Sequence, residues 1–180
     1  FLTLKKIYPD LHVFGCEPHP DEYRYLVPFF GRSLVPVAIS NTAGTGKLYL
    51  NKFGGSSLFG GRGSNDTHEV DIWTLDQFDS WAGHQDKILL WMDIEDSELN
   101  ALKSGPELLK SGRVEWLNIE TRNVPGHDGS PSTADISAFL EPYGYVPVHR
   151  YNVQGAYPEA PGDTIYFKAG VQPLIAGNML

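Results

Sequence analysis

Two apolar runs of the chain each end in carboxylates. Residues 88–92 are apolar and lead into Asp93 and Glu95, and residues 114–119 are mostly apolar and lead into Glu120. A near-continuous apolar run of this length is typical of a strand that helices cover on both faces of a parallel sheet. Ligands of such sheets bind beyond the carboxyl ends of the strands. The pattern therefore predicts a ligand crevice beside these three acids.

The rest of the pattern predicts alternating strands and helices. The expected strands are 12–16, 34–39, 48–50, 69–75, 88–92, 114–119, 145–151 and 164–168. The expected helices are the end of one at 2–8, then 20–30, 97–109 with a break at Gly105-Pro106, and 134–142. We expect a loop at 54–66 and a near-edge strand at 69–75. This order predicts one α/β domain over 1–180, with a mainly parallel sheet and an antiparallel terminal strand pair.

Composition and charge narrow the classes of partner. The 180 residues include 14 basic and 22 acidic side chains, a net charge of -8, which disfavours binding to nucleic acid through its phosphates. No apolar stretch approaches the ~20 residues that cross a bilayer, and no signal peptide pattern opens the sequence. The single Cys16 forms no internal disulfide, and no Cys/His cluster has zinc-site spacing. We expect a cytoplasmic protein without a metal site that binds neither nucleic acid nor membrane.

Five motifs occur in order along the chain. They are Phe14-Gly15-Cys16-Glu17-Pro18-His19-Pro20, Val37-Ala38-Ile39-Ser40, Ser56-Ser57-Leu58, Thr74-Leu75-Asp76 and Met92-Asp93-Ile94-Glu95-Asp96-Ser97-Glu98. Together they resemble the FkbM-type S-adenosylmethionine-dependent methyltransferases, and the last is similar to that family's Lys-Asp-Val-Glu-Gly-x-Glu. The resemblance implies a Rossmann-like methyltransferase sheet and S-adenosyl-L-methionine as cofactor. It also implies O-methylation of a small-molecule or carbohydrate acceptor.

The chain departs from the family pattern in three places. Met92 stands where the family has Lys, and Asp96 stands where it has Gly, although Asp can adopt a left-handed backbone. The family's first strand and glycine turn, Asp-x-Gly-x-x-x-Gly, have no counterpart in residues 1–10. We therefore expect that strand to be missing, which favours a fragment of a longer protein over a form without the complete cofactor site. Four crowded carboxylates at 93–98 predict a raised pKa for one of them, or a cation among them.

The resemblance implies a set of cofactor-binding residues. Glu17 resembles the acid that accepts hydrogen bonds from both ribose hydroxyls, and Pro18 and Ala38 accompany it in matching motifs. Ser56 and Ser57 are candidates for a loop that closes over the cofactor; the alternative is a simple connecting loop.

Catalytic candidates follow the two apolar runs. Asp93 and Glu95 border the expected acceptor pocket, where one of them takes the acceptor's proton as a general base; the alternative is that Asp93 caps the next turn. Glu120 either orients the substrate or forms a structural ion pair with Arg122. We expect three tryptophans in predicted strands, Trp73, Trp91 and Trp116, to lie in the core.

Two other classes of function stay open from sequence. One is a non-catalytic binding module that kept the methyltransferase fold without a complete cofactor site. The other is a different α/β enzyme that acts on a ligand of an acidic pocket, such as a cation-bound sugar.

Overall fold

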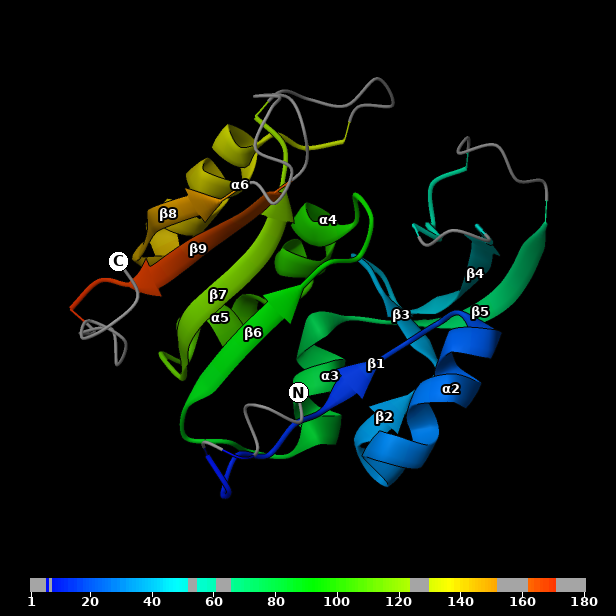
Figure 1. Ribbon diagram of the computed structural model, residues 1–180. Helices are drawn as coiled ribbons and strands as arrows, with labels where there is room; N and C mark the ends of the chain where they lie inside the picture. Colours follow the sequence, from blue (N-terminus) through cyan, green and yellow to red (C-terminus); the bar gives the residue numbers. More distant parts are fainter. Residues whose placement is uncertain are drawn as a thin grey trace.

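The computed structural model of the chain describes residues 6, 8–51, 55–60, 66–123, 130–151 and 162–170. These residues form a mixed α/β fold with strands in three sheets (Figure 1). Most of the predicted helix end at 2–8 and much of the predicted loop at 54–66 lie outside the described residues. None of the described helices is long and apolar enough to cross a membrane.

The first sheet is a short parallel pair joined by a helix. Strand β1 (Gly15–Cys16) pairs with β2 (Leu34–Val35), and α2 (Pro20–Phe30) connects them through a 3-10 turn, η1 (Gly31–Ser33). Proline suits the first helical position, the His19 side chain caps the helix, and Gly31 ends it with φ 57°. The helix predicted over 20–30 is therefore confirmed. The predicted strand at 34–39 is divided at Pro36, which has no N–H to donate to a ladder.

The second sheet has the order β3-β5-β4. Strand β3 (Val37–Ile39) runs parallel to β5 (Thr67–Trp73), and β4 (Gly44–Tyr49) is antiparallel to β5. Two expectations are corrected here. The strand predicted over 48–50 begins at Gly44, and the strand predicted near an edge at 69–75 lies in the middle of its sheet, because the glycine-containing stretch before Leu48 pairs with it.

The third sheet has the order β6-β7-β9-β8. Strand β6 (Ile88–Met92) is parallel to β7 (Val114–Thr121), whereas β9 (Gly162–Lys168) is antiparallel to both β7 and β8 (Tyr145–Tyr151). The antiparallel terminal pair is confirmed. Across the described chain three strand pairs are parallel and three antiparallel, so the sheets are mixed rather than mainly parallel as expected.

The remaining helices have clear local causes. Thr74 and Gln77 form a capping box that begins α3 (Leu75–Ala82), and Ser132 with Asp135 does the same for α6 (Thr133–Leu140), which is followed by η2 (Glu141–Tyr143). The predicted break at Gly105-Pro106 is confirmed, because it separates α4 (Glu98–Lys103) from α5 (Pro106–Lys110). A side chain at Gly105 would meet Leu75 at 2.7 Å, so glycine permits this close packing.

The main core lies on one face of the third sheet. Figure 1 shows α4, α5 and α6 on this face, behind the strands. The fully buried side chains of the core include Leu102, Leu109, Leu117, Ile119, Ile136 and Leu140. On β6, however, Leu89 and Trp91 are 47% and 61% exposed, because the side chains of a strand alternate between faces. The expectations that β6 is covered on both faces and that Trp91 lies in the core are therefore wrong for the described structure. Trp73 packs against the core as expected.

Candidate functional site

A cavity of about 250 Å³ lies where the carboxyl ends of β1, β3 and β6 meet. Six of the eight residues predicted to bind cofactor or act in catalysis line it: Glu17, Pro18, Ala38, Ser56, Asp93 and Glu95. Ser57 and Glu120 are not among its described lining residues. The crevice predicted beside Asp93, Glu95 and Glu120 thus lies beside the first two acids, and its other described walls include β1 and β3 but not β7.

Glu17 stands directly after β1 and is held by the backbone of the next turn. Its own N–H donates to the carbonyl of Val35 at 3.0 Å, which extends the β1–β2 pairing. Its Oε1 accepts the N–H of His19 at 2.8 Å, and this bond orients the carboxylate. Burial raises the pKa of Glu17, although the His19 bond opposes that effect. Its neighbour Cys16 has a pKa raised to about 12 by burial, so that thiol stays protonated at neutral pH.

The turn after β6 forms another wall of the cavity, and its backbone has an unusual conformation. Glu95 and Asp96 have φ of 55° and 75°, a region that non-glycine residues seldom occupy. Aspartate can adopt such a backbone, and in this turn Asp96 does so. Glu98, 3% exposed, closes the turn because its Oε1 accepts the N–H of Ile94 at 2.9 Å.

Ser57 fastens the neighbouring loop to this turn. Its Oγ donates to the carbonyl of Glu95 at 2.8 Å and accepts the N–H of Phe59 at 3.1 Å. Its backbone also exchanges hydrogen bonds with Tyr49, and the residue is 3% exposed. Ser57 therefore positions the wall of the cavity, whereas Ser56 borders the cavity itself.

Three acids near the carboxyl end of the third sheet have raised pKa values. Burial, followed by the charges of Glu95 and Asp163, raises the pKa of Asp93. Burial and the charges of Asp93 and Glu95 raise the pKa of Glu120 to about 7. Burial raises the pKa of Glu98 to about 7 as well. The expectation of a raised pKa within 93–98 is confirmed. Within the ranges that the structure describes, no group of three or more His, Cys, Asp or Glu side chains is placed to hold a metal ion.

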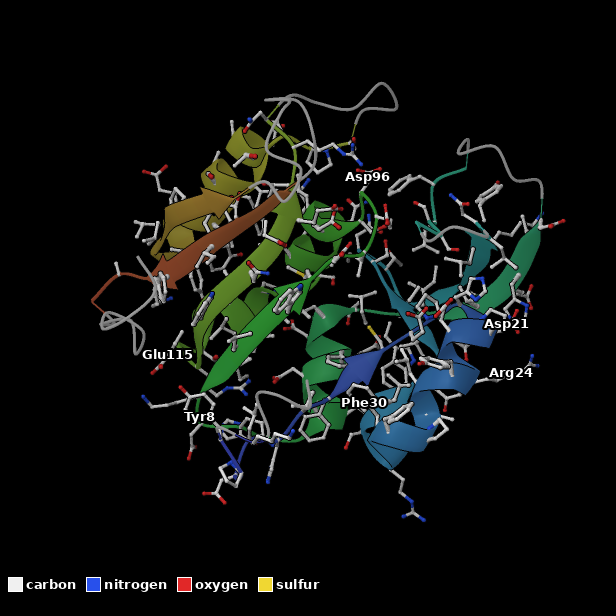
Figure 2. All side chains as sticks on the ribbon, in the orientation of Figure 1. Tyr8, Asp21, Arg24, Phe30, Asp96 and Glu115 are labelled. Carbon is white, nitrogen blue, oxygen red and sulfur yellow. The ribbon has the colours of Figure 1, made fainter. Side chains whose placement is uncertain are left out.

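Arg122 forms its ion pair with Asp96, at 3.2 Å between Nε and Oδ1. The sequence offered Glu120 as its structural partner, but Arg122 acts on Glu120 at longer range, where its charge lowers the pKa. Figure 2 shows Asp96 in the turn beyond the carboxyl end of β6. The aspartate that replaces the family's glycine thus brings a basic side chain to this acidic region.

Sequence reasoning missed one acid of this region. Asp163 lies opposite Glu120 in the antiparallel β7–β9 ladder, and its Oδ1 accepts from the Nδ2 of Asn118 at 3.3 Å. The sequence placed Asp163 in the connection before the last strand. Only the register of the two strands brings it to the site, and no local signal reveals that register.

Fold and cavity together define an α/β protein with a ligand site at the carboxyl ends of its parallel strands. A solved structure with this fold is the crystal structure of Methyltransferase FkbM from Methylobacillus flagellatus KT, with a TM-score of 0.54 and 15% sequence identity. The likeness covers 92% of this chain and 39% of that one, so the chain spans well under half the length of the solved protein. No curated protein sequence matches the chain.

The family follows from the sequence match. The Methyltransferase FkbM domain matches residues 5–147, which is most of the chain. The chain belongs to the FkbM methyltransferase family, and the resemblance carried by its five motifs is confirmed.

Proposed function

We propose that this domain uses S-adenosyl-L-methionine to methylate a hydroxyl of a small-molecule or carbohydrate acceptor. The observation that carries the proposal is that Glu17 and Asp93, which come from strands far apart in sequence, line one cavity. The proposal keeps the sequence-based expectation of a cytoplasmic enzyme that does not act on nucleic acid.

The chemistry of the cavity suits this cofactor. When bound, S-adenosylmethionine supplies a methyl group activated by a positively charged sulfonium. The acids at the carboxyl end of the third sheet favour a positive charge nearby, because several of them repel one another and hold raised pKa values. The cavity of about 250 Å³ is slightly smaller than the range of about 300–1,000 Å³ common for such ligands, so its described walls would surround part of the cofactor.

Glu17 is the proposed ribose contact. A carboxylate accepts hydrogen bonds from two adjacent hydroxyls, and the His19 bond already fixes the orientation of this one. Pro18 and Ala38 would offer apolar surface to the adenosyl group, and Ser56 would border it from the loop.

Asp93 is the proposed general base. Its raised pKa makes its carboxylate a better proton acceptor than an ordinary aspartate, and its position on the cavity wall allows contact with an acceptor hydroxyl. Glu95 would hold the acceptor beside it, and Glu120, whose pKa burial and the charge of Asp93 raise, would orient the substrate. Positioning of the acceptor oxygen in line with the methyl group would supply most of the rate enhancement.

Calorimetric titration with S-adenosylmethionine tests the proposal. Glu17→Ala should weaken binding by about 1.5–3 kcal/mol, the range for a hydrogen bond to a charged group. The exposed acid Glu107 on α5 provides the matched control, because Glu107→Ala removes the same group far from the cavity. An equal affinity of both variants, or a lack of binding by the unchanged chain, would contradict the proposal.

A further inference from the structure

One polar side chain of the cavity wall, that of Ser97, makes no hydrogen bond within the described fold. Ser97 is 1% exposed and is one of the residues that line the cavity. Its Oγ is buried and has no hydrogen-bond partner within the part of the chain that the structure describes. Buried hydroxyls are nearly always paired, because an unpaired one loses its hydration without compensation. A hydroxyl left in this state at a cavity is available to a ligand.

Ser97 also lies at a position where a serine side chain commonly forms a hydrogen bond within the fold. It directly precedes α4, where serine commonly accepts a backbone N–H of the first turn. Ser132 does this before α6, with an extended backbone at φ -80° and ψ 166°. Ser97 has φ -91° and ψ 0° instead, and its side chain makes no capping bond. The turn is closed by Glu98 and the N–H of Ile94, so the Ser97 hydroxyl is not needed for it.

We infer that the Ser97 hydroxyl hydrogen-bonds to the bound methyl donor, an inference that rests on the proposed function. Serine has three accessible staggered rotamers, so its Oγ can turn toward a ligand atom at small cost. The donor is the favoured partner because Ser97 lies buried in the same cavity wall as Glu17 and Asp93, the two residues proposed to contact the donor and to act beside it.

The test compares two buried serines with opposite hydrogen-bonding states. Ser104 is 7% exposed, and its Oγ donates to the carbonyl of Ala101 at 2.7 Å and accepts the N–H of Leu75 at 2.8 Å. It is not among the residues that line the cavity. Ser97→Ala and Ser104→Ala therefore remove the same atom from a ligand-facing site and from a satisfied structural site.

Two measurements on the unchanged chain and both variants decide the matter: calorimetric titration with S-adenosylhomocysteine and the Tm without ligand. Ser97→Ala should weaken binding about 3- to 10-fold, the usual worth of one hydrogen bond. The same variant should raise the Tm by about 2–4 °C, because it removes an unpaired buried hydroxyl. Ser104→Ala should lower the Tm and leave the affinity unchanged.

The failure of this inference is separable from that of the proposed function. If the unchanged chain binds S-adenosylhomocysteine and Ser97→Ala binds it equally well, the role of Ser97 is overturned and the proposed function stands. A lower Tm for Ser97→Ala with unchanged affinity also overturns it, since the hydroxyl then serves the fold. If the unchanged chain does not bind, both the proposed function and this inference fall.

Discussion

The two ends of the third sheet differ in how their charged side chains are paired. At the amino end, Arg113 meets Asp79 in a forked pair with N–O distances of 3.1 and 2.5 Å, and both side chains are less than a fifth exposed. Lys87 pairs with Glu115 at 2.9 Å across the starts of β6 and β7. Asp79 and Glu115 thus each have a basic partner.

At the carboxyl end the acids outnumber their described basic partners. Arg122 pairs with Asp96, while Asp93, Glu98 and Glu120 all have raised pKa values because burial and neighbouring acids disfavour their charged forms. Figure 2 shows Glu115 and Asp96 at opposite ends of the sheet.

The charged side chains at the two ends of the sheet therefore differ in what they contribute to stability and to chemistry. Paired charges at the amino end hold strands and a helix together, and they leave nothing for a ligand to neutralise. Crowded acids at the carboxyl end cost stability, and they suit a cationic cofactor and a proton transfer. Substitutions at the two ends should therefore separate stability from activity.

The largest expected effect is the loss of the proposed base at the carboxyl end. Asp93→Asn removes the proposed proton acceptor but keeps the shape of the side chain, so turnover should fall by about 10²–10⁴ with little change in S-adenosylmethionine affinity. The assay is transfer of a labelled methyl group to the hydroxyl compound that the unchanged chain methylates. Glu115→Gln at the amino end is the control and should keep full turnover. Full activity of Asp93→Asn would show that Asp93 is not the base.

The next largest effect is on stability at the amino end. Arg113→Ala leaves Asp79 without its forked partner in a largely buried setting, so the free energy of unfolding should fall by about 2–4 kcal/mol. Urea unfolding measures this loss, and cofactor affinity measured on the folded variant should be unchanged. A loss below about 0.5 kcal/mol would mean that the pair adds no more than an exposed one.

A moderate, pH-dependent effect is expected at Glu98. Its pKa is raised from 4.5 to about 7 in the folded chain, so between those pH values the folded state binds more protons than the unfolded state. Stability from this group is fully present below pH 4.5 and is lost as the pH rises toward about 7.

Glu98→Gln isolates that effect, because its amide oxygen can still accept the N–H of Ile94. The variant should be more stable than the unchanged chain by about 1–3 kcal/mol at pH 8, and the difference should shrink toward pH 4.5. Urea unfolding across this pH range provides the measurement, with Glu107→Gln as the exposed control. Parallel stability curves for the unchanged chain and Glu98→Gln would show that Glu98 ionises normally.

The smallest effect concerns backbone strain in the turn. Asp96 has φ 75°, where glycine is unstrained and alanine is not, so Asp96→Ala should be less stable than Asp96→Gly by about 1–2 kcal/mol. The Arg122 pair is absent from both variants, so their difference reports the backbone alone. Equal unfolding free energies would show that the left-handed turn relaxes in the variants.

The sequence predicts the parts of this site that depend on local signals. Helix α2 is marked by Pro20 and Gly31. The sequence shows that Asp96, which stands where the family has glycine, is able to adopt a left-handed backbone, and the structure has that backbone there. The acids after β6 and β7 were expected at the sheet's carboxyl end because apolar runs precede them.

The rest depends on contacts that no local pattern records. Asp163 reaches Glu120 only through the β7–β9 register. Exposure of Leu89 and Trp91 was missed because an apolar run has the same sequence pattern whether helices cover one face of its strand or both. The unpaired Ser97 hydroxyl was missed because a serine before a helix predicts a cap, and the backbone angles that prevent capping are visible only in the fold.

We expect Glu17 and Asp93 to enclose the methyl donor between them. A crystal structure of the chain grown with S-adenosylhomocysteine tests this directly. The ligand should lie in the cavity, with its ribose hydroxyls about 2.5–3.0 Å from the Glu17 carboxylate and its sulfur on the side of Asp93. A ligand bound elsewhere on the domain, with neither acid in contact with it, would rule out this binding mode.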